Sequence, residues 1–426
     1  MYSIFEQIES EVRYYSRLFP VVFVKAKGSH MFDDSGKEYL DFFSGAGTLN
    51  YGHNNERLKA RIINYLHEDG IIHALDMATV PKAEFLERFQ QIILWPREYN
   101  YKIQFCGPTG ANCIEAALKL ARKVTKRRSV VHFTNSFHGM SLGGLSIGGY
   151  KKKKLAGVPL YDSVMMPFCD YEKNIDTIAY FEAYLGCIDD EDELPAAVFL
   201  ETVQGEGGVN VASVSWLARL YQLTKKSGIL LIIDDIQVGC GRTGSFFSFD
   251  ELNIIPDMVC LSKSLSGYGL PLSVLLMKPE LDVWTPGEHT GTFRGNNLAL
   301  VAASEALTSF WEEDEFKKDI HKKSKIIAQH LSNLRETHSD VISEIRGRGM
   351  IQGIVFRERR IASDVLKAAF EKQLIVETCG RNNEVLKLLP PLTISSEELV
   401  DGLERVNESI ESARGKLYET YAQLSL

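Results

Sequence analysis

The chain has 426 residues, of which 45% are hydrophobic, so it can bury a large core and should divide into two or three structural units. Its formal net charge is −8, from 48 basic and 56 acidic residues, which argues against nucleic-acid or anionic-lipid binding and favours small-molecule partners. The amino terminus lacks the apolar core of a signal peptide and no later run reaches membrane-spanning length, so a cytoplasmic location is expected.

The cysteines and histidines show no metal-binding pattern. The seven cysteines are scattered and include no C-x-x-C pair, which indicates reduced and mostly buried thiols. None of the ten histidines stands in a zinc-ligand spacing such as H-E-x-x-H. We therefore predict no metal site.

The amino-terminal region starts with a predicted hairpin at residues 21–45, with one strand on each side of the turn DDSG. A helix is predicted next in ERLKARIINYLHEDG, where Leu58, Ile62, Ile63 and Leu66 form one stripe. Gly70 is a plausible stop for this helix.

From about residue 100, short apolar runs alternate with helical segments, which predicts an α/β fold with a mostly parallel central sheet. After residue 300, long helices and the strand IQGIVF indicate a smaller α+β domain that the amino-terminal hairpin joins. We predict residues 1–60 as the amino-terminal part of that small domain, 61–300 as the large domain and 301–426 as its carboxy-terminal part. In such sheets ligands bind at the carboxyl ends of strands.

The first candidate site follows the strand KIQF, in CGPTGANCIEAALKLAR. Gly110 and Ala111 begin a helix with one apolar face, so their amides lack helical carbonyl partners and can bind a phosphate. An ordinary helix cap is the alternative. The next strand, VVHF, is followed by NSFHGM, where Phe137 could stack on a flat ring or simply anchor the loop.

Three charged positions follow later strands. ETVQGEGG places Glu201 at a strand end and Glu206 in a glycine-rich loop, to orient a substrate or to cap the loop. LLIIDD brings Asp234 to the end of a buried strand, where it needs a cation or a hydrogen-bond donor such as a protonated ring nitrogen, whereas Asp235 is a structural cap. Lys263 in LSKSLSGYGLP could be desolvated enough to form a Schiff base, or could be an ordinary surface lysine.

A phosphate site, a stacking aromatic residue, a buried aspartate and a strand-end lysine are the groups that a pyridoxal phosphate enzyme needs. TGANCIEAALKLAR, FHG, ETVQGEGG, IIDDIQVGCGRTG, SKSLSGYGLP and GTFRGNN resemble, in the same order, the motifs of class III aminotransferases. The resemblance covers nearly the whole chain. It implies the fold type I transferase architecture, with pyridoxal 5'-phosphate as the cofactor.

The resemblance also implies a role for each cofactor contact. Lys263 would bind the cofactor covalently and transfer the proton, and Asp234 would keep the pyridine nitrogen protonated. Gln237 would bind the phenolic oxygen, while Phe137 and Ile236 would pack on the two ring faces. The amides of two residues would hold the phosphate: Gly110 and Ala111.

In the family, the segment matching GTFRGNN reaches across a dimer interface. Thr292 is therefore expected to bind the cofactor phosphate of the neighbouring subunit in a homodimer or larger homo-oligomer. The family usually has glycine where Arg294 stands and proline where Asn297 stands, and both departures leave Thr292 in place.

The substrate site departs from the family pattern. Many relatives carry an arginine three residues before Pro-Pro-Leu, which binds the α-carboxylate of glutamate and is masked by the glutamate matching Glu206. Here that position is Lys387, which supplies charge without a bidentate fork. Arg242 or Arg17 could help to bind the α-carboxylate of glutamate.

Within the family, YSRLFPVVF and SGAGTLNYGHNN resemble the diaminobutyrate aminotransferases, especially the 2-oxoglutarate-linked enzymes of ectoine biosynthesis. This implies transfer of the amino group of glutamate to L-aspartate 4-semialdehyde. Alternatives are another ω-amine donor (ornithine, acetylornithine, 4-aminobutyrate or lysine), an aminomutase, and a non-catalytic cofactor-binding regulator. The basic runs KRR and KKKK are expected to be solvated loops, without nucleic-acid binding.

Overall fold

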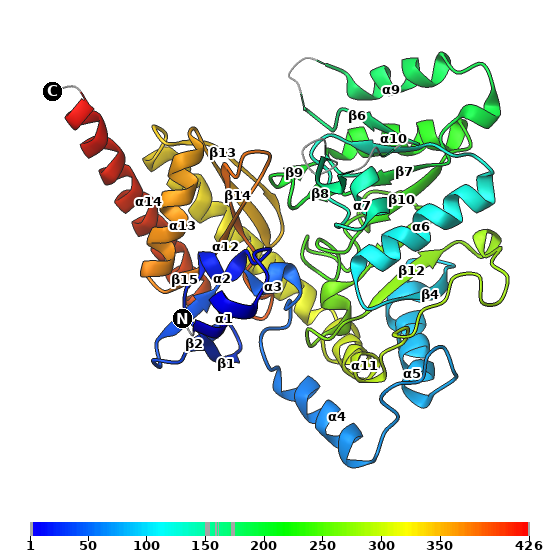
Figure 1. Cartoon of the computed structure of the whole chain (residues 1–426), viewed down its shortest axis with the longest axis horizontal. Coiled ribbons are helices and arrows are strands. Elements are labelled where there is room, and N and C mark those ends of the chain that lie inside the picture. Colours follow the sequence, from blue (N-terminus) through cyan, green and yellow to red (C-terminus); the bar gives the residue numbers. More distant parts are fainter. Residues whose placement is uncertain (1–2, 150–153, 158–159, 161, 172–174, 425–426) are drawn as a thin grey trace.

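The computed structural model describes the whole chain except residues 1–2, 150–153, 158–159, 161, 172–174 and 425–426. The run KKKK thus lies outside the described residues but for its last lysine. The chain forms a larger α/β unit, on the right in Figure 1, and a smaller unit on the left. The long carboxy-terminal helix and the amino terminus both belong to the smaller unit.

The larger unit is built on a seven-stranded sheet with the order β4-β12-β11-β10-β7-β5-β6. Only β12 runs antiparallel to its neighbours, which confirms the predicted mostly parallel sheet. The strands are short and, apart from the two edge strands β4 and β6, almost entirely buried, as expected where helices cover both faces. Their bounds are β4 (Lys102–Gly107), β5 (Val130–Phe133), β6 (Ser163–Met166), β7 (Ala197–Leu200), β10 (Leu230–Asp234), β11 (Met258–Leu261) and β12 (Ser273–Met277).

The helices of this unit begin at recognisable caps. The Ser213 hydroxyl accepts from the amide of Trp216 and starts α10, and the Asp176 carboxylate caps α9 in the same way. The helices are α4 (Glu56–His67), α5 (Val80–Arg88), α6 (Gly110–Thr125), α7 (Leu142–Ser146), α9 (Thr177–Gly186), α10 (Val214–Lys226) and α11 (Asn297–Trp311).

The predicted stripe of α4 is only partly buried in the chain. Leu58 is fully buried, but Ile63 is 40% exposed and Leu66 is 47% exposed. Ile62 is intermediate. The periodicity therefore identified the helix, while half of its apolar face is left uncovered by this chain.

The smaller unit contains two four-stranded sheets. The first has the order β1-β2-β3-β15, so the amino-terminal strands pair with a strand far along the chain. The second has the order β13-β14-β17-β16. The bounds are β1 (Phe23–Lys27), β2 (His30–Asp33), β3 (Glu38–Asp41), β13 (Ile342–Arg348), β14 (Ile351–Phe356), β15 (Leu374–Ile375), β16 (Glu377–Cys379), β17 (Val385–Leu388), α12 (Glu315–Thr337), α13 (Arg359–Glu371) and α14 (Ser396–Leu424).

The predicted hairpin at residues 21–45 is in fact three strands. Gly28, with φ +58°, and Ser29 turn the chain between β1 and β2, so the first predicted strand is itself a hairpin. The turn DDSG then joins β2 to β3 as expected. A glycine within an apolar run can mark such a turn.

Each unit has hydrophobic clusters of its own. In the larger unit, one cluster covers one face of the seven-stranded sheet and includes Leu307 of α11, and a second covers the other face under α6. In the smaller unit, a cluster joins Phe19 and Tyr39 to the carboxy-terminal helices. Because α11 packs with α4 and α5, we place the second boundary after Trp311 rather than at residue 300.

Two further predictions from composition concern the thiols and the membrane. All seven cysteines are free, and all except Cys187 are buried, which confirms mostly buried thiols. Among the helices of the described part of the chain, none is both long enough and apolar enough to cross a membrane.

Candidate active site

The predicted motifs meet around one cavity of about 320 Å³ at the carboxyl ends of the central strands. Its walls come from the loops after β4, β5, β7, β10 and β11, which are the positions expected for a ligand in a sheet of this type. The predicted site residues that line it are Gly110, Ala111, Phe137, Glu206, Asp234, Ile236, Gln237 and Lys263.

The amino terminus of α6 faces this cavity. Asn112 Oδ1 accepts from both the amide and the hydroxyl of Thr109, at 3.1 and 2.9 Å, so the preceding loop is held at the helix start. The chain passes close to Ile236 at this point, because a Cβ at Gly110 would lie 2.8 Å from Cδ1 of that isoleucine. The amides of the first turn and the positive end of the helix dipole are therefore available to an anion.

Asp234 is almost fully buried and is held from two sides. Its Oδ2 lies 2.7 Å from Nδ1 of His138, and its Oδ1 accepts from the amide of Ile236 at 3.1 Å. Burial alone would lower the pKa of His138, but the hydrogen bond and charge of Asp234 outweigh it and raise that pKa. Asp234 is thus a fixed acceptor on the cavity wall.

Lys263 follows β11 and has a left-handed backbone, with φ +49°. Its Nζ donates to the carbonyl oxygen of Ala46 at 2.9 Å. Burial lowers the pKa of Lys263, which favours the neutral and nucleophilic amine. The structure thus supports the interpretation of Lys263 as a desolvated lysine able to form a Schiff base, rather than as an ordinary surface lysine.

Glu206, Gln237 and Lys387 form a polar cluster beside the cavity. Lys387 Nζ is fully buried and lies 2.6 Å from Oε1 of Glu206. Gln237 Nε2 donates to the same Glu206 oxygen at 3.1 Å. Burial would raise the pKa of Glu206, but the charges of Lys387 and Lys263 lower it to about 2. Glu206 therefore masks Lys387 in the structure, a pairing that the sequence left open.

Arg17 and Arg242, which were considered for substrate binding, do not line this cavity. Arg17 is exposed and pairs with Glu11. Arg242 is fully buried and donates to the carbonyl oxygens of Met350 and Pro390, so the idea that it binds a substrate carboxylate is wrong.

Thr292 is exposed and does not line the cavity of its own chain. Its carbonyl oxygen lies 2.8 Å from Nε2 of His73. This position is compatible with a role toward another chain.

Two further side chains hold the site in place. His138 is the side-chain partner of Asp234, a contact that the FHG motif does not predict. For Glu201 the loop-cap interpretation agrees with the structure, because its Oε2 accepts from the amide of Phe137 at 3.0 Å. Burial raises the pKa of Glu201 to about 7. Glu201 therefore holds the loop that carries the stacking residue.

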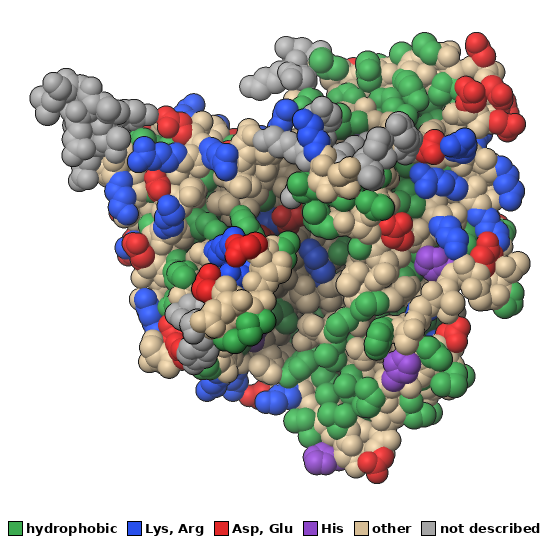
Figure 2. All heavy atoms as spheres, in the orientation of Figure 1, with side chains coloured by type: hydrophobic (Ala, Val, Ile, Leu, Met, Phe, Trp, Pro, Cys, Tyr) green, Lys and Arg blue, Asp and Glu red, His purple; other side chains and the backbone are tan. Residues whose placement is uncertain are grey.

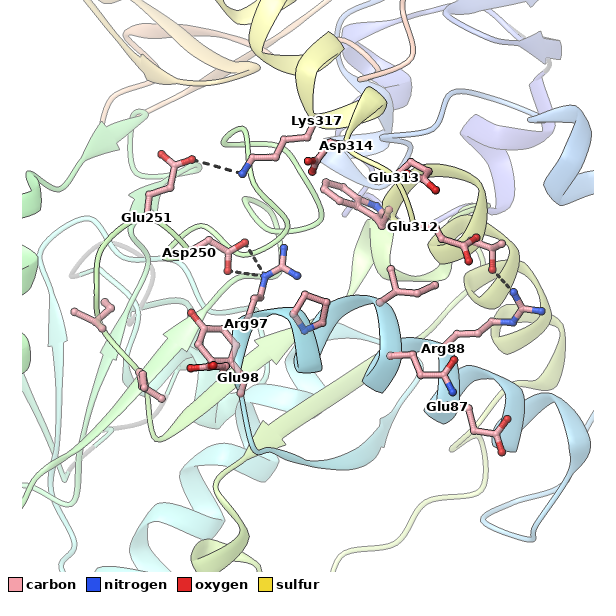
Figure 3. Close-up of a pocket in the computed structure, with 18 of the residues that line it drawn as sticks. Glu87, Arg88, Arg97, Glu98, Asp250, Glu251, Glu312, Glu313, Asp314 and Lys317 are labelled. Atoms are coloured by element: carbon pink, nitrogen blue, oxygen red, sulfur yellow. Dashed lines mark hydrogen bonds and ion pairs between the residues drawn. The ribbon is translucent and has the colours of Figure 1, made fainter.

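A larger groove of about 1240 Å³ lies on another part of the molecule (Figure 3). Two ion pairs lie within it, between Arg97 and Asp250 at 2.9 Å and between Lys317 and Glu251 at 4.0 Å. The predicted motifs line the smaller cavity, and no predicted site residue lines this groove within the described part of the chain. We therefore place the chemistry in the smaller cavity.

The smaller cavity fits a phosphorylated pyridine ring. A glycine at position 110 keeps the helix start open, and a Cβ at Gly205 would lie 1.8 Å from Oε1 of Gln237, so small residues preserve its shape. Phe137 and Ile236 offer apolar surface, and Asp234 offers a buried acceptor. Together with the mostly parallel sheet, this defines a pyridoxal phosphate-dependent enzyme of fold type I.

Comparison with known proteins agrees with this class and narrows it. The model of the aminotransferase class-III family matches residues 12–410, and the chain belongs to that family. A curated protein of Halalkalibacterium halodurans, diaminobutyrate--2-oxoglutarate transaminase, is 54% identical, with 96% of each chain covered. The protein of the same name from Virgibacillus pantothenticus is 53% identical, over 96% of this chain and 98% of the relative.

Solved structures agree with the fold. Ornithine aminotransferase from Toxoplasma gondii superposes with a TM-score of 0.84 at 28% identity, over 97% of this chain and 94% of the other. That structure shows partial occupancy of pyridoxal phosphate at its active site. N-acetylornithine aminotransferase from Stenotrophomonas maltophilia gives a TM-score of 0.76 at 27% identity, over 94% of this chain and 99% of the other.

Proposed function

We propose that this enzyme transfers the amino group of L-glutamate to L-aspartate 4-semialdehyde, forming L-2,4-diaminobutyrate and 2-oxoglutarate. The observation that carries the proposal is the name shared by curated relatives that are 50–54% identical over nearly the full chain. The masked cation beside the cavity supports it, because the two substrates place different groups at that position.

The residues of the cavity have distinct roles in this proposal. When bound, the cofactor supplies an electron sink for the bond broken next to the amine. Asp234 holds the proton on the pyridine nitrogen, and His138 keeps Asp234 in position. Lys263 binds the cofactor covalently and moves the proton of the substrate carbon that carries the amine. Gln237 binds the phenolic oxygen.

The remaining cofactor contacts orient the ring. Phe137 and Ile236 pack against its two faces and exclude water from it. The amides of Gly110 and Ala111 hold the phosphate at the start of α6, where the helix dipole favours a negative charge. Orientation of the ring fixes which substrate bond is broken.

Glu206 and Lys387 select the substrate group that enters. With Glu206 in place, Lys387 is neutralised and the site accepts the uncharged carbon chain of the amino-aldehyde. When Glu206 turns away, the α-carboxylate of glutamate can take its place on Lys387. Arg17 would contribute to substrate binding only by moving from its exposed pair with Glu11.

We further propose that a second copy of the chain completes the site through Thr292. Exposed apolar side chains surround this segment, including Ile72, Leu75 and Phe293 at 44%, 43% and 67% exposure. Figure 2 shows hydrophobic side chains gathered on the lower part of the molecule, over the region that contains α4. An apolar area of this kind is typical of a protein interface. The half-exposed stripe of α4 adds to it.

A cytoplasmic location is also part of this proposal. It rests on the seven free cysteines, since thiols stay reduced in the cytoplasm and commonly form disulfides in oxidising compartments. Cell fractionation with an antibody to the chain tests it directly.

The test of the reaction is a single-turnover titration of the cofactor-loaded protein with one amine at a time. L-2,4-Diaminobutyrate and glutamate should each bleach the visible absorption of the bound cofactor quickly, whereas ornithine and 4-aminobutyrate should not. Fast bleaching by another diamine would replace the substrate and keep the aminotransferase. Diaminobutyrate isomerised without consumption of a keto acid would instead indicate an aminomutase.

A further inference from the structure

Lys387 is enclosed by two carboxylates rather than one. Its Nζ lies 2.6 Å from Glu206 Oε1 and 3.0 Å from Glu377 Oε1, and the lysine side chain is fully buried. With all three groups ionised, this cluster carries one net negative charge. Glu377 is therefore a second counter-ion of Lys387, and the proposed reaction assigns it no role.

The two carboxylates are held differently. Glu377 is on β16 directly opposite Lys387 on β17, so the strand pairing fixes it, and its side chain is only 3% exposed. Glu206 is in the glycine-rich loop after β8 (Val203–Gln204), and its side chain is 28% exposed. Of the two carboxylates, Glu206 is the one with room to turn away from Lys387, because its side chain is more exposed and belongs to a loop.

Glu206 also stands between Lys387 and the spaces open to a substrate. It lines both the cofactor cavity and a neighbouring cavity of about 470 Å³, whereas neither Lys387 nor Glu377 lines either of them. A substrate carboxylate consequently reaches Lys387 only by replacing Glu206. Glu377 stays on the lysine during that exchange.

The exchange has a simple electrostatic consequence. The incoming carboxylate gains the contact with Lys387 that Glu206 gives up, so the strength of that contact largely cancels. The total charge does not cancel, because the site holds one more negative charge after a carboxylate enters. Glu377 repels that additional charge.

We propose that Glu377 is a specificity-determining residue that weakens the hold of Lys387 on substrate carboxylates. The inference rests on the proposed function, in which one site binds glutamate, releases 2-oxoglutarate and then accepts an amino-aldehyde. A lysine without a permanent counter-ion would retain the dicarboxylate product. Glu377 thus favours release and keeps the shared site open to both substrates.

The test is calorimetric titration of 2-oxoglutarate into the cofactor-loaded protein, in which this keto acid has no amine to accept. Glu377→Gln keeps the size and a hydrogen-bond acceptor for Lys387 but removes the charge. We expect its dissociation constant for 2-oxoglutarate to fall about five- to tenfold, the effect of one nearby charge at intermediate dielectric. Glu377→Asp, which keeps the charge, should stay within about twofold of the wild type.

Two further measurements make the result specific. Glu336→Gln removes the same charge from the exposed face of α12 and should leave 2-oxoglutarate binding unchanged. In the single-turnover reaction of Glu377→Gln with diaminobutyrate, the change in rate should be smaller than the gain in 2-oxoglutarate affinity, because that substrate does not displace Glu206.

Unchanged or weaker binding of 2-oxoglutarate by Glu377→Gln would overturn the proposal. Weaker binding of every ligand, together with a lower melting temperature, would likewise overturn it and assign Glu377 a purely structural role. The calorimetric comparison does not use diaminobutyrate. A wild-type protein that fails to react with diaminobutyrate would therefore reject the proposed substrate while leaving the effect of Glu377 measurable.

Discussion

Replacement of Asp234 by asparagine tests the role of the buried carboxylate most sharply. Asparagine has the same size and can still accept from the amide of Ile236, which lies 3.1 Å from Oδ1 in the native site. The change removes the single negative charge of Asp234. His138 contacts this carboxylate at 2.7 Å, and the pyridine nitrogen would face it. The packing of the cavity wall should therefore survive while its electrostatics change.

The expected loss follows from the burial of Asp234, which is 5% exposed. Removal of one partner from a buried ion pair costs about 3–5 kcal/mol. If the pair forms with the protonated ring nitrogen, the rate of amine transfer should fall between about 10²- and 10⁴-fold. The assay is the single-turnover reaction with glutamate, with melting temperature and cofactor content measured in parallel.

Asp235→Asn is the matched control, because Asp235 is also buried but accepts from the amide of Ser248 and does not line the cavity. Its rate should stay within about tenfold of the wild type. A loss below tenfold for Asp234→Asn, or equal losses for the two variants, would refute the reasoning.

Other predictions concern the cavity shape, the second chain and pH. Gly205→Ala should weaken cofactor binding at least about tenfold in equilibrium dialysis, because the new Cβ would lie 1.8 Å from Gln237 Oε1; unchanged binding would contradict this geometry. Thr292→Ser should retain cofactor affinity and Thr292→Ala should lose about tenfold, as expected for one charge-assisted hydrogen bond; equal affinities would exclude the contact. Burial raises the pKa of Glu201 and of Asp235 to about 7, so the folded state binds protons more tightly than the unfolded state. The free energy of unfolding of the cofactor-free protein should therefore fall as the pH rises from about 4 to about 7, and Glu201→Gln should flatten the slope in urea titrations; an unchanged slope would reject this assignment.

The positions of the main site residues could be predicted because each follows a short apolar strand. In a parallel sheet the carboxyl ends of such strands meet at one edge, so Asp234 and Lys263 come together although the chain separates them. The resemblance to the family motifs added an expected role for each residue. The alternation of short apolar strands with helices predicted the mostly parallel sheet.

Contacts that depend on register and packing could not be predicted in this way. The pairing of Glu377 with Lys387 requires the register of β16 on β17, which the sequence of either strand does not specify. The burial of Arg242 depends on carbonyl groups of Met350 and Pro390, more than a hundred residues away. The amino-acid sequence shows that these residues are charged, but it does not show which groups they contact.

The central claim is that the amino group of glutamate goes to the terminal carbon of the acceptor. Its most direct test is incubation of the cofactor-loaded protein with ¹⁵N-labelled glutamate and unlabelled L-aspartate 4-semialdehyde, followed by NMR of the product. The account predicts diaminobutyrate labelled at the terminal nitrogen and unlabelled at the α-nitrogen. Label at the α-nitrogen, or no labelled diaminobutyrate, would contradict it.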